Sequence, residues 1–416
     1  MKQKIDVQEL RIGMYITDID RPWLDSPFLF QGFPVESQRD IDWIRRTCKY
    51  VYIDEEQYRD LTPGATSDIA PERHTETEDA IQKLAKKLPY KNKASFEEEF
   101  KSARDVHSKA KSYMETVLED VRLGNSIDAE GAKDVVKNLV NSITRNPDTG
   151  LWFTRLRKKD EYTADHSLNV CILTLIFGRH LNFSETVLNE LGVGALLHDI
   201  GKMRVPLDIL NKPGSLTDEE LQLVKQHPTF GAEILKTTPG IPGSAVDIAY
   251  CHHERASGNG YPRGLKATDM TLFSKMVSIV DVYDAITSNR VYHHGMSPSD
   301  ALRNMYRWQH KDFDESLVED FIQCLGIYPV GSVVQLGTGD IGIIMSNDKN
   351  HRLRPTILLV LNEEKVPLSQ SKIINLTLFD GVDANKYVIK KVFGPDEFSI
   401  DLNQYLAADL PEVSMA

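Results

Sequence analysis

Residues 198–202 read His198-Asp199-Ile200-Gly201-Lys202 and come directly after an apolar run that ends at Leu197. Ser184 lies where it can cap a helix leading into this run, so His198 and Asp199 are predicted to occupy a helix end. Imidazole and carboxylate side chains at facing helices are the donors from which metal sites in helical bundles are built. Five further donors of these two kinds lie in predicted helical segments on both sides: His166, His227, His252, His253 and Asp281.

The adjacent donor pairs predict two metal ions in place of one. Neighbouring residues in the middle of a helix point about 100° apart, so one ion cannot easily bind both members of a pair. His198 can bind one ion while the carboxylate of Asp199 bridges two, with the ions ~3.5–4 Å apart. Imidazole and carboxylate without thiolate favour iron, manganese, nickel, copper or zinc over magnesium.

Groups suited to phosphate accompany these donors. Lys202, three residues after the bridging carboxylate, can neutralise a phosphate held at the metal ions. Arg290 can bind a phosphate through two N–H groups. Gly260 and Tyr261 belong to a glycine-rich turn, residues 258–262, that permits close backbone approach and presents a tyrosine at the rim of the cleft. Each of these residues alone can also be explained as a surface or loop residue. Their position beside the histidines is what favours a role in phosphate binding.

The length, charge and composition of the chain limit the classes of protein to which it can belong. The chain has 416 residues, which at ~150 residues per domain predicts two to three domains. Its net charge of −12, from 49 basic and 61 acidic residues, argues against general nucleic-acid binding, DNA included. Widely spaced cysteines, apolar runs far below the ~20 residues that span a bilayer and the lack of a secretory signal predict a reduced, cytoplasmic protein without a membrane span.

The pattern along the chain predicts a mainly α fold with β structure at both ends. Strands are expected within 7–16 and at 50–54, with a short helix at 40–46 between them. The predicted parts are a small α+β N-terminal domain at 1–62, a linker at 63–95, a helical connector at 96–145, a helical catalytic domain at 146–327 and a β-rich extension at 328–416.

Apolar residues recur at spacings of three and four between Phe96 and Thr144. One hypothesis is that this stripe dimerises and couples the N-terminal domain to the site. The alternative is a helix that packs on its own domain.

Together these stretches resemble the HD-GYP domain, a branch of the HD metal-dependent phosphohydrolases. The N-terminal IDVQELRIGMYITDID and KYVYID resemble a domain of unknown function that often precedes HD-GYP domains, and the tail from Tyr328 resembles the usual extension. The catalytic motifs agree in order and spacing: HDIGK at 198–202, KPG-x-LT-x-x-E at 212–220, His227, HHERASGNGYP at 252–262 and DVYDAITSNRVY at 281–292.

The resemblance implies hydrolysis of the bacterial second messenger cyclic di-GMP to pGpG, and in some members on to GMP, in signalling that regulates biofilm and motility. Two divalent ions are implied, with iron or manganese favoured over zinc, nickel or magnesium. Asp199 and Lys202 would act in catalysis, with Lys202, Arg290, Gly260 and Tyr261 binding substrate. One metal would lie on His166, His198, Asp199 and Asp281, and the second on His227, His252 and His253, with Asp199 shared.

The sequence departs from the family pattern in four places. The glutamate that completes three-metal sites is Tyr162 here, so two metals are expected. The aspartate common before G-x-G-Y-P is Ser257. The usual Arg-Pro-Tyr is Arg290-Val291-Tyr292, and His293 stands where a basic phosphate contact is common. All seven core ligands are intact, so we expect an active enzyme.

Two alternative functions stay open at this point. The domain can be a metal-stabilised module that senses a dinucleotide, or binds a diguanylate cyclase or other signalling partner, with little turnover. The chemistry can also be kept and the substrate changed to another cyclic dinucleotide, such as cyclic GMP-AMP.

Overall fold

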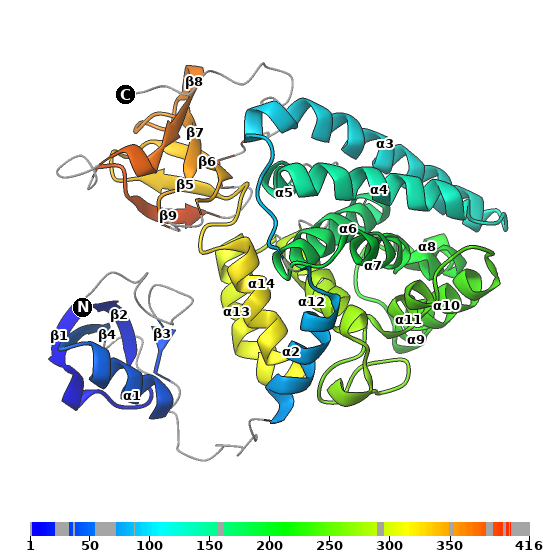
Figure 1. Ribbon diagram of the computed structural model, residues 1–416, viewed down its shortest axis with the longest axis horizontal. Helices are drawn as coiled ribbons and strands as arrows, with labels where there is room; N and C mark the ends of the chain where they lie inside the picture. Colours follow the sequence, from blue (N-terminus) through cyan, green and yellow to red (C-terminus); the bar gives the residue numbers. More distant parts are fainter. Residues whose placement is uncertain are drawn as a thin grey trace. The chain divides into compact units, whose positions relative to one another are not determined.

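The protein is described here by a computed structural model that covers residues 2–20, 33–35, 38–54, 72–86, 88–155, 162–288, 295–348, 351, 353–379, 386–393, 397–398 and 400. The chain divides into two compact units, Met1–Arg73 and His74–Ala416 (Figure 1). Over these residues no helix has both the length and the apolar character that crossing a membrane requires.

Unit 1 is a small antiparallel sheet with one helix. Its strands are β1 (Lys2–Asp6), β2 (Tyr15–Ile19), β3 (Phe33–Pro34) and β4 (Tyr50–Asp54), in the order β1-β4-β2-β3. Ile16, Val51 and Ile44 of α1 (Gln38–Thr47) are fully buried in the core that joins the sheet to its helix. The α+β prediction for this region is therefore confirmed.

One strand prediction in unit 1 is wrong. Residues 7–16 are not a continuous strand, because Val7–Glu9 forms a 3₁₀ turn, η1. The side chain of Asp6 accepts a hydrogen bond from the backbone N–H of Gln8 at 2.9 Å and starts that turn. Gly13, with φ of 96°, reverses the chain before β2 begins.

Unit 2 is mainly helical. Its helices are α2 (Glu72–Leu84), α3 (Phe96–Arg122), α4 (Ala129–Arg145), α5 (Pro147–Phe153), α6 (Tyr162–His180), α7 (Glu185–Leu197), η4 (Ile200–Arg204), α8 (Leu207–Leu210), α9 (Asp218–Val224), α10 (His227–Thr237), α11 (Gly243–Cys251), η5 (Ala267–Asp269), α12 (Leu272–Thr287), α13 (Pro298–Asp312) and α14 (Glu315–Leu325). Helices α6, α7, α11 and α12 pack in succession and form the bundle that carries the site. Two predicted caps are confirmed, Ser184 at α7 and the capping box of Thr217 and Glu220 at α9.

The predicted connector at 96–145 belongs to the helical unit itself. Helices α3 and α4 lie side by side and pack on α6 and α7 (Figure 1). The apolar stripe of α3, including Phe100, Met114 and Val117, is buried within the chain. The stripe thus packs on its own domain, which was the alternative, and α3 and α4 form part of the helical unit; homodimerisation stays a prediction.

The linker prediction at 63–95 is also wrong in part. Helix α2 lies inside this range, and most of it belongs to unit 2. The hydroxyl of Thr77 donates a hydrogen bond to Asp314, at the start of α14, with a distance of 2.9 Å. Polar composition alone does not reveal this contact, since its partner lies 237 residues further along the chain.

The predicted β-rich tail is confirmed. Its antiparallel sheet has the order β8-β7-β6-β5-β9. Gly331, just before this sheet, lies so close to Arg155 that an added Cβ would be 2.4 Å from its Cγ. Arg155 in turn donates a hydrogen bond to the hydroxyl of Tyr283 on α12 at 2.8 Å. The strands are β5 (Val333–Leu336), β6 (Ile341–Ser346), β7 (Thr356–Leu361), β8 (Pro367–Asn375) and β9 (Ile389–Phe393), with η6 (Leu376–Leu378) after β8.

Candidate metal centre

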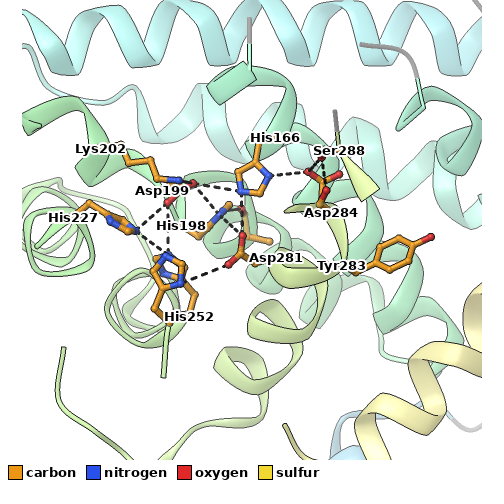
Figure 2. Close-up of polar contacts among 12 residues, drawn as sticks. His166, His198, Asp199, Lys202, His227, His252, Asp281, Tyr283, Asp284 and Ser288 are labelled. Carbon is orange, nitrogen blue, oxygen red and sulfur yellow. Dashed lines mark hydrogen bonds and ion pairs between the residues drawn. The ribbon is translucent and has the colours of Figure 1, made fainter. Parts of the chain in front are cut away.

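The seven predicted donors lie together, most of them near helix ends and Asp281 in the middle of α12. The side chains come from five segments of unit 2, and Figure 2 shows six of them turned toward one another. All but one are buried; the ring of His253 is 18% exposed. Two groups of donor atoms lie close enough to hold an ion, and they share one carboxylate, that of Asp199. The donors are His166 on α6, His198 and Asp199 after α7, His227 on α10, His252 and His253 after α11, and Asp281 on α12.

The carboxylate of Asp199 lies at the middle of the cluster. Its Oδ1 is 3.2 Å from Nε2 of His227 and 3.6 Å from Nε2 of His252. Its Oδ2 is 3.4 Å from Nε2 of His166 and 3.5 Å from Nε2 of His198. One oxygen thus faces each group, which is the arrangement that a bridging carboxylate requires.

Backbone carbonyls fix the orientation of three imidazoles. Nδ1 of His198, His227 and His252 lies 2.8, 2.7 and 2.9 Å from the carbonyl oxygen three residues earlier in each case. A carbonyl oxygen only accepts hydrogen bonds, so Nδ1 carries the proton and Nε2 keeps its lone pair. Each of these three Nε2 atoms faces Asp199.

These lone pairs test whether the residues fit a metal. Nε2 of His227 and Nε2 of His252 are 3.3 Å apart, although neither nitrogen carries a proton to donate. Within the described part of the chain, Nε2 of His198 and Oδ1 of Asp199 are buried and lack a hydrogen-bond partner. Acceptors that converge without donors repel one another, and a cation between them removes that repulsion. The donor set therefore fits divalent metal ions.

The charges of the ligands agree with this fit. Burial lowers the pKa of His198 to about 4, so its ring is neutral at physiological pH. Burial opposes ionisation of Asp199, but the charge of Lys202 outweighs it and holds the pKa of that carboxyl well below its usual range. Burial likewise opposes ionisation of Asp281, but its contacts with His166 and with the other neighbouring histidines outweigh burial and lower the pKa. Neutral imidazoles and ionised carboxylates are the forms that bind metals.

Local backbone geometry explains how adjacent residues can serve one centre. His198 ends α7 with helical angles, whereas Asp199 leaves the helix with φ of −100° and ψ of 8°. Its carboxylate is thus not held at the helical spacing from His198. A Cβ on Gly201 would lie 2.0 Å from the carbonyl oxygen of His227, so the absence of a side chain lets η4 pack directly on the start of α10.

The predicted substrate groups have different outcomes. Lys202 is 20% exposed and forms an ion pair with Oδ2 of Asp199. The ring of Tyr261 stacks on His253 with centroids 4.7 Å apart, and burial raises the pKa of its phenol. A Cβ on Gly260 would lie 2.4 Å from Cα of Glu254, so the turn approaches the backbone closely, as predicted. Arg290 lies outside the described residues.

Two buried carboxylates near the centre were missed by the sequence analysis. Glu254 accepts hydrogen bonds from the backbone N–H groups of Arg263 and Leu265, at 2.8 and 2.9 Å, and shapes the turn that carries Tyr261. Asp284 contacts Nδ1 of His166 at 2.8 Å. The only local signal for Asp284 is its position one helical turn after a predicted ligand.

Two sequence families match the chain. The profile of the HD domain family matches residues 154–317, a range that contains all seven donors. A domain of unknown function, DUF3391, matches residues 2–132. The second match therefore extends beyond unit 1 and through α3, which packs on the helices of the centre.

Curated relatives include two named phosphodiesterases. Cyclic di-GMP phosphodiesterase PA4108 of Pseudomonas aeruginosa is 36% identical over 373 residues, which cover 89% of this chain and 88% of the relative. 3'3'-cGAMP-specific phosphodiesterase 3 of Vibrio cholerae is 34% identical over 172 residues, 41% of this chain and 37% of the relative. The solved structure of Bd1817 from Bdellovibrio bacteriovorus aligns with 78% of this chain and 99% of that chain, at 20% identity and a TM-score of 0.47.

Proposed function

The chain belongs to the HD-GYP family of HD-domain proteins, and from that premise we propose that it is a metal-dependent phosphodiesterase that hydrolyses cyclic di-GMP to pGpG. The observation that carries the proposal is the cluster of seven donors around Asp199, with its unprotonated Nε2 atoms facing an ionised carboxylate. The named activity of PA4108, a relative over nearly the whole chain, supports the choice of substrate. The reaction lowers the level of a bacterial second messenger.

The centre holds two divalent ions in this proposal. His166 and His198 would hold one ion and His227, His252 and His253 the other, with the carboxylate of Asp199 available to both; Asp281, 3.1 Å from Nε2 of His166, would complete the first set. We propose iron or manganese, as the family resemblance implies; the nitrogen and oxygen donors alone also suit nickel, copper and zinc. When bound, such ions supply Lewis-acid activation of water and of the phosphate.

The side chains of the chain itself contribute charge and orientation. Lys202 lies at the edge of the centre, beside Asp199, where its ammonium faces a phosphate and offsets negative charge that grows on the non-bridging oxygens. Tyr261 stacks on the ring of His253 and thereby helps to keep that ring in place. Arg290 remains our proposed second phosphate contact.

A second substrate, 3'3'-cGAMP, has a specific observation in its favour. A relative named for that activity is 34% identical over 41% of this chain, and the matched stretch is of the size of the catalytic domain. The two substrates differ in one base, so the metal chemistry serves both alike. A sensing module without turnover is the third candidate.

The test incubates the purified, metal-loaded protein with cyclic di-GMP and with 3'3'-cGAMP and follows the products by chromatography. We expect pGpG from cyclic di-GMP, with GMP showing whether the second bond is cut. The matched variant replaces His198 and Asp199 by alanine and should abolish hydrolysis. Turnover by this variant, or tight binding without turnover by the parent protein, would refute the proposal.

A further inference from the structure

Asp284 contacts the side of His166 that faces away from the centre (Figure 2). Its Oδ2 lies 2.8 Å from Nδ1 of His166, and only 1% of the residue is exposed. On the other side of the same ring, Nε2 is 3.1 Å from Oδ1 of Asp281. Residues three apart lie on one face of a helix, so two carboxylates of α12 reach both nitrogens of one imidazole.

The hydrogen-bond partner of Nδ1 in His166 differs in kind from the partners of Nδ1 in the other imidazoles. His198, His227 and His252 each direct Nδ1 to a carbonyl oxygen of their own chain segment, three residues earlier. His166 directs Nδ1 to a carboxylate on another helix, 118 residues further along the chain. An ionised carboxylate accepts a stronger hydrogen bond than a carbonyl does, and it makes the imidazole a stronger electron donor.

Asp284 is itself held in place. The hydroxyl of Ser288, which is fully buried at the end of α12, donates to the backbone carbonyl of Asp284 and lies 3.4 Å from its Oδ2. Ser288 thus places a hydroxyl of the same helix segment beside this carboxylate. Such an arrangement suits a residue whose task is to orient another.

We propose that Asp284 is the positioning residue of His166: it holds the proton on Nδ1 and thereby directs an electron-rich Nε2 to the first metal. This inference rests on the metal centre of the proposed function, but not on its substrate. Hydrogen-bond partners of this kind change metal affinity 10–100-fold when they are removed. We therefore expect a loss of that order at the site of His166, His198 and Asp199, and a smaller one at the second site.

The test compares three variants of the full-length protein. Asp284→Leu removes the acceptor, Asp284→Asn keeps an acceptor but removes the charge, and Thr287→Val is the matched control. Thr287 is a buried residue of the same helix whose hydroxyl donates to the carbonyl oxygen of Tyr283 at 2.9 Å and lies 3.4 Å from that of Asp284. Manganese affinity is measured for each by titration against a competing chelator, with thermal unfolding as a check of folding.

We expect Asp284→Leu to bind one manganese ion 10–100-fold more weakly, Asp284→Asn to fall between it and the parent, and Thr287→Val to match the parent. Wild-type affinity at both sites in Asp284→Leu would overturn the proposal. Should that variant fail to fold, wild-type affinity in Asp284→Asn would overturn it equally. Because the readout is metal affinity, a parent protein inactive on cyclic di-GMP would count against the proposed function and leave this result standing.

Discussion

Lys202 pairs with Asp199, and we propose a second role for it on the substrate. Its ammonium stabilises the ionised form of Asp199, and its 20% exposure leaves it accessible to a substrate. We predict that Lys202→Met lowers kcat by about 100-fold, the usual effect of removing one charge-stabilising group at a reacting centre. Because Lys202 also stabilises ionised Asp199, variant and parent are compared at equal metal content, which elemental analysis checks. A kcat within threefold of the parent would show that Lys202 does not act on the phosphate.

Gly201 is decisive because of the side chain it lacks. A Cβ there would lie 2.0 Å from the carbonyl oxygen of His227, a clash with backbone that only a shift of η4 or α10 can relieve. We predict that Gly201→Ala lowers both the unfolding temperature and the metal content. Gly243→Ala is the control, since a Cβ at that position, in the first turn of α11, meets no atom within 4 Å. Equal behaviour of the two variants in metal analysis would contradict this reading.

The metal-binding donors of the candidate site were largely predictable from the sequence. The residues that hold those donors in position were not. All seven donors follow from histidines and aspartates that recur in helical segments. The structure brings six of them into two candidate metal groups and places Asp281 3.1 Å from His166 beside them. Asp284 was not predicted, since its partner His166 lies 118 residues away and only folding joins them. Gly201 was quoted with its motif but had no role, because the backbone it must approach belongs to another helix.

An ion pair between a buried carboxylate and a partly exposed arginine joins α3 to α4. Glu99 is 2% exposed and accepts two hydrogen bonds from Arg145, at 2.6 and 2.9 Å, and one from Ser142 at 2.7 Å. We predict that Arg145→Met lowers the free energy of unfolding by about 3 kcal/mol, because it leaves a buried carboxylate without its cation. The double variant Glu99→Gln with Arg145→Met should recover part of that loss in urea unfolding. A single-variant loss below about 0.5 kcal/mol would contradict the prediction.

The free energy of unfolding is expected to depend on pH through Asp320, a residue of α14 near α2. Burial and the nearby carboxylates of Glu319 and Glu78 raise the pKa of Asp320 to about 6, from an ordinary value of 3.8. The folded protein therefore binds more protons than the unfolded chain between these values, so the free energy of unfolding falls as the pH rises through them. Above pH 6 Asp320 is ionised in the folded protein as well, and the decrease in the free energy of unfolding is complete.

Asp320→Asn removes this titration and tests its sign. We predict a gain of about 1 kcal/mol in the free energy of unfolding at pH 8, a figure reduced for the partial exposure of the residue. The gain should vanish as the pH falls towards 4. Thermal unfolding of variant and parent at both pH values measures it, and a gain that is equal at the two would refute the assignment.

Elements with local signals were predicted well, and elements defined by long-range contacts were not. Ser184 and Thr217 mark helix starts with their own side chains, and both caps are present. Residues 7–16 failed as a strand because a 3₁₀ turn and Gly13 interrupt them. Helix α2 lay within a polar stretch, and its bond to Asp314 depends on a residue far along the chain.

At the scale of the whole molecule, the sequence predicted a helical catalytic region between two parts that contain β structure, and all three are present. The boundaries differ, because α3 and α4 belong to the helical unit that carries the centre. An apolar stripe is the same whether it faces another copy or its own domain, so periodicity could not decide between these. Homodimerisation and a cyclase partner remain predictions.

The central claim is that two metal ions, bound around Asp199, make this protein a cyclic di-GMP phosphodiesterase. The most direct test strips the protein of metal, adds manganese or ferrous iron stepwise without oxygen, and follows pGpG formation at each step. The account predicts that hydrolysis rises to a plateau at two equivalents per chain and that the variant lacking His198 and Asp199 stays inactive throughout. Hydrolysis at full rate in the stripped protein, or a fully loaded protein that binds cyclic di-GMP and never cleaves it, would contradict the account.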